Sequence, residues 1–307
     1  MTGFDKQAKR EIDALAAYLT RITSEEPQVF DEQFHARLKR INELSLLCPE
    51  KRDELIRYCS RACAYELDRG TMSHYCRNKP LGYAGDYLVN DWIYKKDVST
   101  HPLGGNWDAF YQRFPVAQAV RNRNEYFCRL FCDLTGKSPG GVSVLNLGCG
   151  SCRVVADAID RAGHAVKGSR FHCVDQERNA IEYAKRTLRE TLPAHVSFQW
   201  EVANVLRFQT EGRYGLVWAG GLFDFLEDHY AKTLLKAMWS WTNAGGQIVF
   251  SNLHPDNPSR NAMEWCWRWF LRYRTKDDLR TLCDAAGIPP RRCGLNRSRS
   301  AFACFVS

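Results

Sequence analysis

The sequence lacks a hydrophobic run long enough to cross a membrane, since its longest apolar stretches fall far short of the roughly 20 residues that a bilayer span requires. Residues 1–15, MTGFDKQAKREIDAL, are charged and contain no apolar segment of the kind found in a secretory signal peptide. The chain also has no biased tract, with 45% hydrophobic and 25% charged residues. We therefore expect a soluble, cytoplasmic protein without membrane association.

No segment concentrates charge of one sign. The net charge is +8, but the 43 lysines and arginines are spread along the chain and interleaved with 35 acidic residues. This balance suits an anionic small ligand better than nucleic acid, which requires a basic patch or a recognisable binding motif. We expect a small-molecule substrate and no nucleic-acid partner, and the sequence leaves open whether the chain forms a homodimer.

The 13 cysteines form no repeating framework that would indicate disulfides. Cys149 and Cys152 make one C-x-x-C, but no second pair follows at the spacing of a zinc ribbon. Cys59 and Cys63 lie one helical turn apart, where buried free thiols behave as small hydrophobic groups. We expect reduced, structural cysteines and no bound metal.

The first third of the chain is predicted to be helical. Apolar residues recur at three- and four-residue intervals, which predicts amphipathic helices over residues 5–22, 26–47 and 49–68. An ordered loop and a short helix are expected over 74–97, a break at HPLGGNW (101–107), and a long helix over 114–134. We interpret 1–125 as an N-terminal helical cap or lid and 126–307 as the core.

From Val142 onward, strands and helices alternate. This pattern predicts an α/β fold with a doubly wound, mostly parallel sheet of seven strands. The last two strands, in RRCGLNRS and AFACFVS, are too close for a helical crossover and suit a hairpin, which places one antiparallel strand at the end of the sheet. A ligand is expected beyond the carboxyl ends of the parallel strands.

The first strand leads into a glycine turn in SVLNLGCGSCRVV, residues 143–155. Arg153 occupies the third glycine position of the dinucleotide fingerprint, and no P-loop is present, so a phosphate cradle is not indicated. Asp175 ends the second strand, where a carboxylate can accept hydrogen bonds from a ribose diol, and Asn204 after the third can meet an adenine amino group. These features together describe an adenosine that carries no phosphate.

Four motifs in order resemble those of the class I S-adenosylmethionine (SAM) methyltransferases: VLNLGCGSC, FHCVD, YGLVWAGGLFDFL and NAGGQIVFSN. The resemblance implies SAM as cofactor, S-adenosylhomocysteine as product and no metal. The implied cofactor-binding residues are Asn146, Gly148, Gly150, Asp175, Gln176, Asn204, Val205 and Gly220. Arg123, on the preceding helix, is a candidate for the SAM carboxylate or part of a solvated helix face. Two residues depart from the pattern: Asn146 stands where an acid is usual, and Cys152 replaces a frequent glycine.

Two further stretches narrow the resemblance. KPLGYAGDYLVNDWIY (79–94) and SNLHPDNPSRNAMEWCWRWFLRYRT (251–275) resemble a bacterial subgroup of hydroxy-fatty-acid methyl ester biosynthesis proteins. The layout with a helical cap also resembles bacterial methionine S-methyltransferases, which form S-methylmethionine on a route to dimethylsulfoniopropionate. The resemblance implies methyl transfer either to the thioether of methionine or to a carboxylate that becomes a methyl ester. A third hypothesis is a non-catalytic SAM-binding sensor or scaffold.

A thioether acceptor needs no general base, so orientation and charge stabilisation carry the reaction. Aromatic faces and carboxylates stabilise a sulfonium, and an amino acid requires an acid for its ammonium and a guanidinium for its carboxylate. The residues expected to act on the acceptor are Tyr83, Asp86, Asp224, Tyr273 and Arg274, with Arg272 as the alternative guanidinium. The stretch EWCWRWFLRY (264–273) has two interpretations, a site for the acceptor or a helix packed on the sheet.

Overall fold

The computed structural model describes residues 3–22, 31–100, 102–189, 193–289, 293–297 and 302–306. The chain forms two compact units: a helical unit of residues 1–118 with 258–270, and a sheet unit of residues 119–257 with 271–307. The sequence placed a single boundary at 125/126. The structure divides the chain a few residues earlier and assigns 258–270, which follows the fifth strand, to the helical unit.

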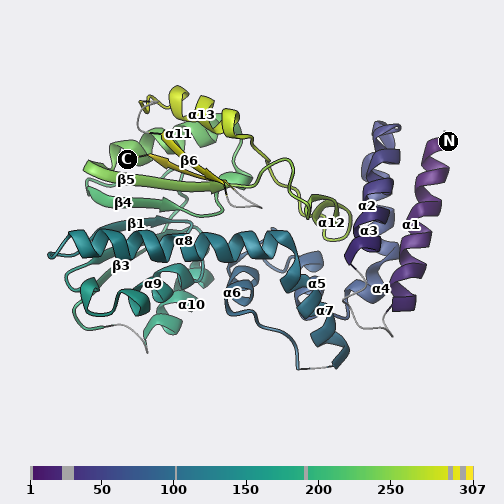
Figure 1. Ribbon diagram of the computed structural model, residues 1–307, viewed down its shortest axis with the longest axis horizontal. Coiled ribbons are helices and arrows are strands. Elements are labelled where there is room, and N and C mark those ends of the chain that lie inside the picture. Colours follow the sequence, from purple (N-terminus) through teal and green to yellow (C-terminus); the bar gives the residue numbers. More distant parts are fainter. Residues whose placement is uncertain are drawn as a thin grey trace. The chain divides into compact units, whose positions relative to one another are not determined.

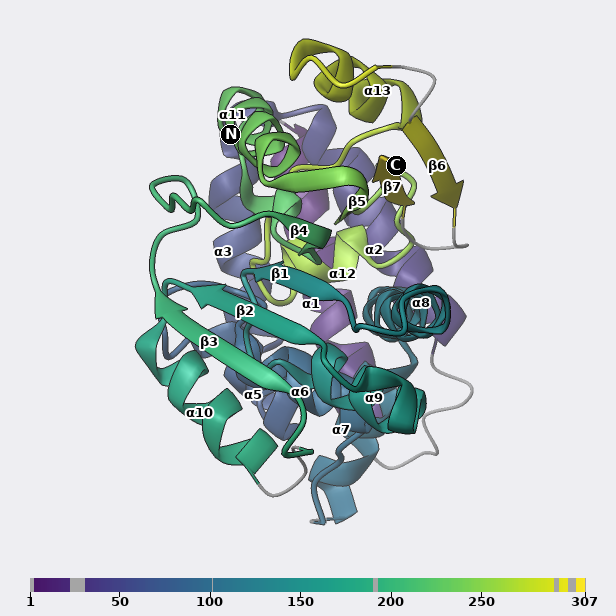
Figure 2. The same ribbon diagram turned by 90° about the vertical axis from the view of Figure 1, so that its left-hand side faces the viewer.

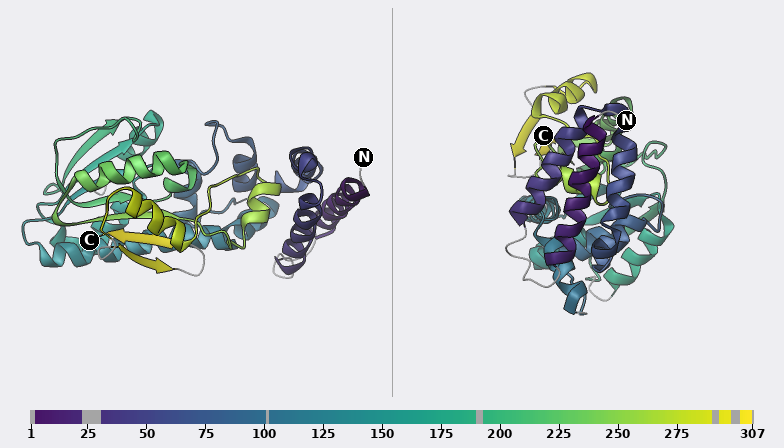
Figure 3. Two further views of the ribbon diagram at one scale, coloured as in Figure 1. Left: turned by 90° about the horizontal axis from the view of Figure 1, so that it is seen from above. Right: turned by 90° about the vertical axis from the view of Figure 1, so that its right-hand side faces the viewer.

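Helices build the helical unit, coloured purple to blue in Figure 1 except for α12, which is yellow-green. They are α1 (Gly3–Ile22), α2 (Asp31–Leu46), η2 (Pro49–Lys51), α3 (Arg52–Ala62), α4 (Ala64–Leu67), α5 (Thr71–Asn78), α6 (Tyr87–Lys95), α7 (Pro102–Arg113) and α12 (Arg260–Trp265). Helix α1 packs against both α2 and α3, as the right-hand view of Figure 3 shows. The helix predicted over 49–68 is interrupted at Cys63, and residues 26–30 of the second predicted helix lie outside the described residues.

The expected break at HPLGGNW is wrong for residues 102–107, which begin helix α7, while residue 101 lies outside the described residues. Pro102 starts the helix, where its missing N–H costs no hydrogen bond. The two glycines allow close packing against two loops: a Cβ on Gly105 would lie 2.6 Å from the carbonyl oxygen of Ser99, just before α7, and one on Gly104 would lie 3.1 Å from that of Arg69, between α4 and α5. Glycine here marks a close backbone approach within a helix and not a chain break.

Aromatic side chains fill the core of the helical unit. Phe34, Phe110, Phe114 and Trp267 meet edge to face, with ring centroids 4.9–6.2 Å apart where they touch. Helix α12 contacts α2 and α3, and Trp265 is fully buried. The interpretation of residues 264–273 as a helix packed on the sheet is therefore wrong: α12 ends at Trp265 and belongs to the helical unit. The alternative interpretation, a site for the acceptor, stays a hypothesis.

Seven strands form one sheet in the order β3-β2-β1-β4-β5-β7-β6. Their bounds are β1 (Ser143–Leu147), β2 (Arg170–Asp175), β3 (Ser197–Val202), β4 (Tyr214–Ala219), β5 (Thr242–Asn252), β6 (Cys293–Arg297) and β7 (Phe302–Val306). The first five pair in parallel, and β7 is antiparallel to both of its neighbours. This confirms the predicted fold class, although β7 lies between β5 and the edge strand β6 and does not itself form the edge.

Helices cover both faces of the sheet (Figure 2). They are α9 (Arg153–Ala162) and α10 (Arg178–Arg189) on one face and α11 (Asp228–Ser240) and α13 (Lys276–Ala285) on the other, with η3 (Gly163–Val166) and η4 (Phe223–Phe225) in connections. Helix α8 (Pro115–Lys137) packs Phe127 on Trp218 of β4 and Phe131 on Phe171 of β2. Because β1, β2, β4 and β5 are parallel, their carboxyl ends lie at the same edge of the sheet. Among the described helices, none is long and apolar enough to span a bilayer.

Candidate functional site

The turn after β1 has the backbone geometry that its glycines allow. Gly148 (φ 62°), Gly150 (φ 53°) and Cys152 (φ 52°) all adopt left-handed conformations before α9 begins. A Cβ added to Gly148 would touch only Leu222, at 3.7 Å, so the backbone at this turn stays accessible. The same contact places the loop after β4 next to the turn after β1.

Asp175, the last residue of β2, fastens this turn to the second strand. Its Oδ2 accepts a hydrogen bond from the Gly150 N–H (2.8 Å), and its Oδ1 accepts one from the Glu177 N–H (2.9 Å). Burial raises the pKa of this carboxyl, while the backbone hydrogen bonds favour its charged form. A carboxylate oxygen has more than one acceptor site, so both oxygens can also accept from a diol.

Asn204 and Gln176 lie together beyond the ends of β3 and β2. Asn204 Nδ2 is 3.4 Å from Gln176 Oε1, and its Oδ1 accepts a hydrogen bond from the Leu206 N–H (2.9 Å). Both side chains are exposed, whereas Val205 is half-buried and packs on the core between the sheet and α11. The two amides are thus placed side by side at the edge where a ligand is expected.

Asn146 and three thiols lie beneath the glycine turn. Asn146 is buried, and its Nδ2 is 3.9 Å from Cys152 Sγ. Burial raises the pKa of Cys149, Cys152 and Cys173, so all three stay protonated near neutral pH. The cysteines in the part of the chain that the structure describes are free thiols. Within the same residues no cluster of His, Cys, Asp or Glu is arranged to hold a metal ion.

Arg123 of α8 lies against the glycine turn that follows β4. A Cβ on Gly221 (φ 80°) would be 2.2 Å from Arg123 Nη1, and one on Gly220 would be 3.1 Å from Arg123 Cδ. The Gly221 N–H donates to Ser251 Oγ (2.9 Å), which ties this turn to β5. Gly221 therefore makes room for the Arg123 guanidinium, whereas a side chain at Gly220 would first meet Trp218 Nε1, at 2.8 Å.

Asp224 follows this turn in η4 and is almost completely buried. Its Oδ1 accepts a hydrogen bond from the Leu253 N–H (2.6 Å). Burial raises its pKa to about 6, and the positive charges of Arg123 and Arg274 partly oppose that shift. Asp224 is thus a second buried carboxylate near the glycine turns, besides Asp175.

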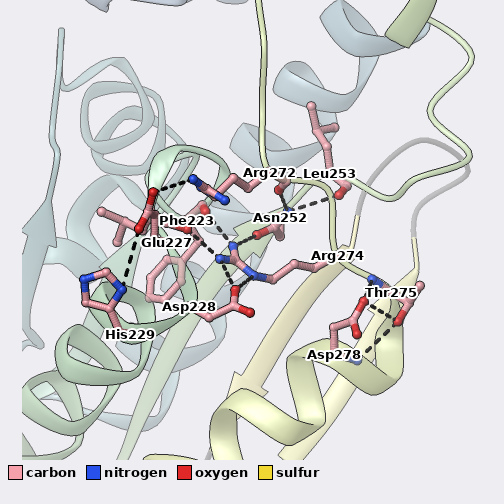
Figure 4. A network of polar contacts seen from close by, with 11 residues as sticks. Phe223, Glu227, Asp228, His229, Asn252, Leu253, Arg272, Arg274, Thr275 and Asp278 are labelled. Atoms are coloured by element: carbon pink, nitrogen blue, oxygen red, sulfur yellow. Dashed lines mark hydrogen bonds and ion pairs between the residues drawn. The ribbon is translucent and has the colours of Figure 1, made fainter. Parts of the chain in front are cut away.

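Arg274 does not have the predicted role, because its guanidinium is fully occupied by the protein (Figure 4). Nε and Nη2 both donate to Asp228 Oδ1, at 3.1 and 2.8 Å, and Nη1 donates to Phe223 O (2.8 Å) and Asn252 Oδ1 (2.7 Å). Nη2 also donates to the carbonyl oxygen of Leu226. These five hydrogen bonds use all five N–H donors, so none is left for a substrate carboxylate.

The other basic and aromatic candidates of this segment differ in exposure. Arg272 is half exposed and pairs with Glu227 at 2.6 Å. Tyr273 is half-buried, with its hydroxyl oxygen shielded from solvent. Asn252 and Asp228, which hold Arg274, were missed by the sequence analysis. The only signal in the sequence is the position of Asn252 at the end of a buried strand.

Asp86 and Tyr83 belong to the helical unit. Asp86 caps helix α6: its Oδ1 accepts hydrogen bonds from the Leu88 N–H (3.0 Å) and the Val89 N–H (3.2 Å). Burial raises the pKa of the Tyr75 hydroxyl, and a hydrogen bond to the Asp86 carboxylate raises it further. Tyr83 is half-buried in the preceding loop, where Gly85 (φ 71°) leaves space for the indole of Trp269. Asp86 is thus a helix cap, a structural role that was not predicted from the sequence.

Comparison with known proteins gives a family to the sheet unit. Residues 144–246 match the family model described as a methyltransferase domain. These residues form a methyltransferase domain. The match covers the two glycine turns, Asp175, Asn204 and Asp224 and ends in the fifth strand. No curated protein matches the chain in sequence.

Solved structures share this fold at low sequence identity. One is a protein from Bordetella parapertussis described as a possible exported protein, with a TM-score of 0.63 and 18% identity over 76% of this chain and 85% of that one. Another is magnesium protoporphyrin IX methyltransferase from Synechocystis PCC 6803 with bound S-adenosylhomocysteine, with a TM-score of 0.52 and 12% identity over 76% of this chain and 97% of that one. The methyltransferase domain therefore has the architecture that its motifs predicted.

Proposed function

We propose that the protein is a SAM-dependent methyltransferase that methylates the thioether sulfur of free methionine. The proposed cofactor residues are Gly148 and Gly150, whose backbone a ligand can approach, with Asp175 for the ribose and Asn204 with Gln176 for the adenine. Arg123 would bind the carboxylate of SAM. The left-handed backbone at Gly148, where an added Cβ would meet Leu222 no closer than 3.7 Å, and the remaining acceptor sites of Asp175 support this assignment.

When bound, SAM supplies a methyl group on a positively charged sulfur and leaves as a neutral thioether. The acceptor sulfur contributes a lone pair and becomes a sulfonium, so charge is conserved and no proton is released. Residues of this chain therefore need only to bind the acceptor, orient it and exclude water. A thioether acceptor therefore asks less of the site than a hydroxyl acceptor, which would need a general base to remove its proton.

The observation that carries the acceptor proposal is the buried carboxylate of Asp224. It lies in the loop that contacts Gly148 through Leu222, and its pKa of about 6 keeps it largely ionised at pH 7 and above. An ionised carboxylate in a buried setting favours a cationic partner, and the ammonium group of an amino acid is one. We assign the ammonium contact to Asp224, because Asp86 already caps α6.

An acceptor screen tests this proposal. The protein is incubated with SAM and, in separate reactions, methionine, other amino acids, thiols and hydroxy fatty acids, and the products are identified by mass spectrometry. We expect S-methylmethionine and S-adenosylhomocysteine in equal amounts. A methyl ester from a hydroxy fatty acid would replace the proposed acceptor by the carboxylate class. SAM binding by calorimetry with no turnover of any acceptor would indicate a sensor or scaffold instead.

A further inference from the structure

Arg274 contacts the loop on both sides of Asp224. Its guanidinium donates to the carbonyl oxygens of Phe223 and Leu226, which flank Asp224 in the chain, and to Asp228 at the start of α11. It also donates to Asn252, the last residue of β5. One buried side chain thereby connects η4, α11 and β5 (Figure 4).

The backbone next to Arg274 fixes Asp224 directly. The Arg272 N–H donates to the main-chain oxygen of Asp224 (2.7 Å), and the Leu253 N–H donates to its Oδ1 (2.6 Å). The Arg274 N–H in turn donates to Leu253 O (3.1 Å). Asp224 is therefore held by the N–H of Arg272, which lies in the extended segment that Arg274 anchors, and by the N–H of Leu253, whose carbonyl oxygen accepts from the Arg274 N–H.

We propose that Arg274 is a positioning residue that fixes the place and the charge state of Asp224 for binding of the cationic end of the acceptor. The expected effect of Arg274 on turnover rests on the proposed function. The expected effect of Arg274 on the position and charge of Asp224 does not. A buried guanidinium with five protein acceptors is pre-organised, so it can hold a loop that carries a functional carboxylate with little freedom.

The charges around Asp224 determine the direction of the electrostatic effect. Arg123 from α8 and Arg274 from the extended segment both favour its ionised form. Asp228 lies against the guanidinium of Arg274 and offsets part of its charge, although its own side chain is 80% exposed. Loss of the positive charge at 274 should therefore raise the pKa of Asp224, and loss of the negative charge at 228 should lower it.

The direct test is a carbon-NMR titration of the Asp224 carboxyl in the full chain, which requires no substrate. The variants are Arg274→Gln, which removes the charge and the fork, Arg274→Lys, which keeps only the charge, and Asp228→Asn, whose amide oxygen still accepts from Arg274. Arg280→Gln is the matched control, because it removes one positive charge from an exposed pair with Asp277. Thermal melting is recorded for every variant to verify that it folds.

We expect the midpoint of the Asp224 titration to rise in Arg274→Gln, to fall in Asp228→Asn, and to stay in place in Arg280→Gln. Arg274→Lys should keep the midpoint near that of the wild type. Where the acceptor screen has given a substrate, Arg274→Lys should also lower kcat by about 100-fold, the loss typical of a misplaced site group. Arg280→Gln should leave kcat and KM unchanged.

An unchanged Asp224 midpoint in Arg274→Gln, or in Asp228→Asn where the Arg274 variants do not fold, would overturn the inference, whatever the reaction proves to be. A kcat in Arg274→Lys equal to that of the wild type would overturn the positioning role alone. If no acceptor is methylated by the wild-type protein, the proposed function fails, but the titration still decides whether Arg274 controls Asp224. Asp228→Asn provides this answer even if the Arg274 variants do not fold.

Discussion

At the scale of single residues, environment and not residue type decides what a charged group can do. Asp175 and Asp224 are both buried aspartates near the carboxyl ends of strands. Burial raises the pKa of both carboxyls, to about 6 for Asp224, but Asp175 accepts from two backbone N–H donors through its side chain and Asp224 from one. We therefore expect substitution of Asp175 to change the affinity for SAM, and substitution of Asp224 to change the pH dependence of stability.

The first prediction concerns Asp175. Asp175→Ala should weaken SAM binding at least about tenfold, because two charge-assisted hydrogen bonds to the ribose are worth about 1.5–3 kcal/mol each. Isothermal titration calorimetry measures the Kd. Glu182→Ala serves as control, because this residue forms an exposed pair with Lys185 on α10. An affinity for SAM that is unchanged in Asp175→Ala would remove Asp175 from the proposed site.

The second prediction concerns the pH dependence of stability at Asp224. Because its folded pKa is raised from 3.8 to about 6, the native state binds this proton more tightly than the unfolded chain does. The stability contribution is present below pH 4 and is lost as the pH rises through 6, at a cost of roughly 3 kcal/mol. Asp224→Asn should therefore raise Tm at pH 8, and the gain should disappear toward pH 4. A Tm difference that is independent of pH would contradict the assigned pKa.

At the scale of elements, caps and glycines explain features that look functional in the sequence. Asp86 caps α6, and Thr275 with Asp278 forms a capping box at the start of α13. Gly104 and Gly105 lie within α7 and not in a turn. A motif rich in glycine, tyrosine and acid can thus be required by local backbone geometry before it contributes to any reaction.

The third prediction separates the two roles of Asp86. Asp86→Ala should cost about 1 kcal/mol of unfolding free energy, because two backbone N–H groups of α6 lose their acceptor. Asp86→Asn keeps an oxygen at the cap and should cost much less. Urea denaturation measures both, and kinetics then isolate any effect of the charge. A raised KM in Asp86→Asn at unchanged stability would return Asp86 to the acceptor site.

At the scale of the whole molecule, the helical unit is built from segments far apart in sequence. Arg52 of α3 pairs with Glu264 of α12 at 2.6 Å, and the Trp265 indole donates to Asn42 Oδ1 (3.3 Å). Residues 258–270 therefore depend on α2 and α3 for their packing. Deletion of residues 1–70 would expose Trp265, so it is a poorer test of the cap than a point substitution.

The fourth prediction uses this dependence. Trp265→Ala should destabilise the helical unit by about 3–5 kcal/mol, the usual cost of truncating a fully buried tryptophan. Calorimetric melting should show an earlier transition, while the Kd for SAM, measured below that transition, should stay unchanged because the proposed cofactor residues all lie in the sheet unit. A parallel loss of SAM affinity would show that the cofactor site needs the helical unit. Phe4→Ala, at an exposed aromatic residue, is the control.

The sequence by itself determined the features that rest on local pattern. The alternation of strands and helices, the left-handed glycine turn after β1 and the carboxylate at the end of β2 follow from periodicity and from residues a few positions apart. The terminal hairpin follows from the short connection between β6 and β7, which is too short for a helical crossover. These are physical constraints that a short window of residues contains in full.

Only the tertiary structure decided the role of Arg274 and the place of residues 258–270. Arg274 bonds to groups 22 to 51 positions away, and its five donors are satisfied only when η4, α11 and β5 meet. A sequence shows an arginine near a glycine-rich site but not which acceptors surround it. Because burial and hydrogen-bond saturation depend on the whole fold, they determine whether such a side chain holds a substrate or holds the protein together.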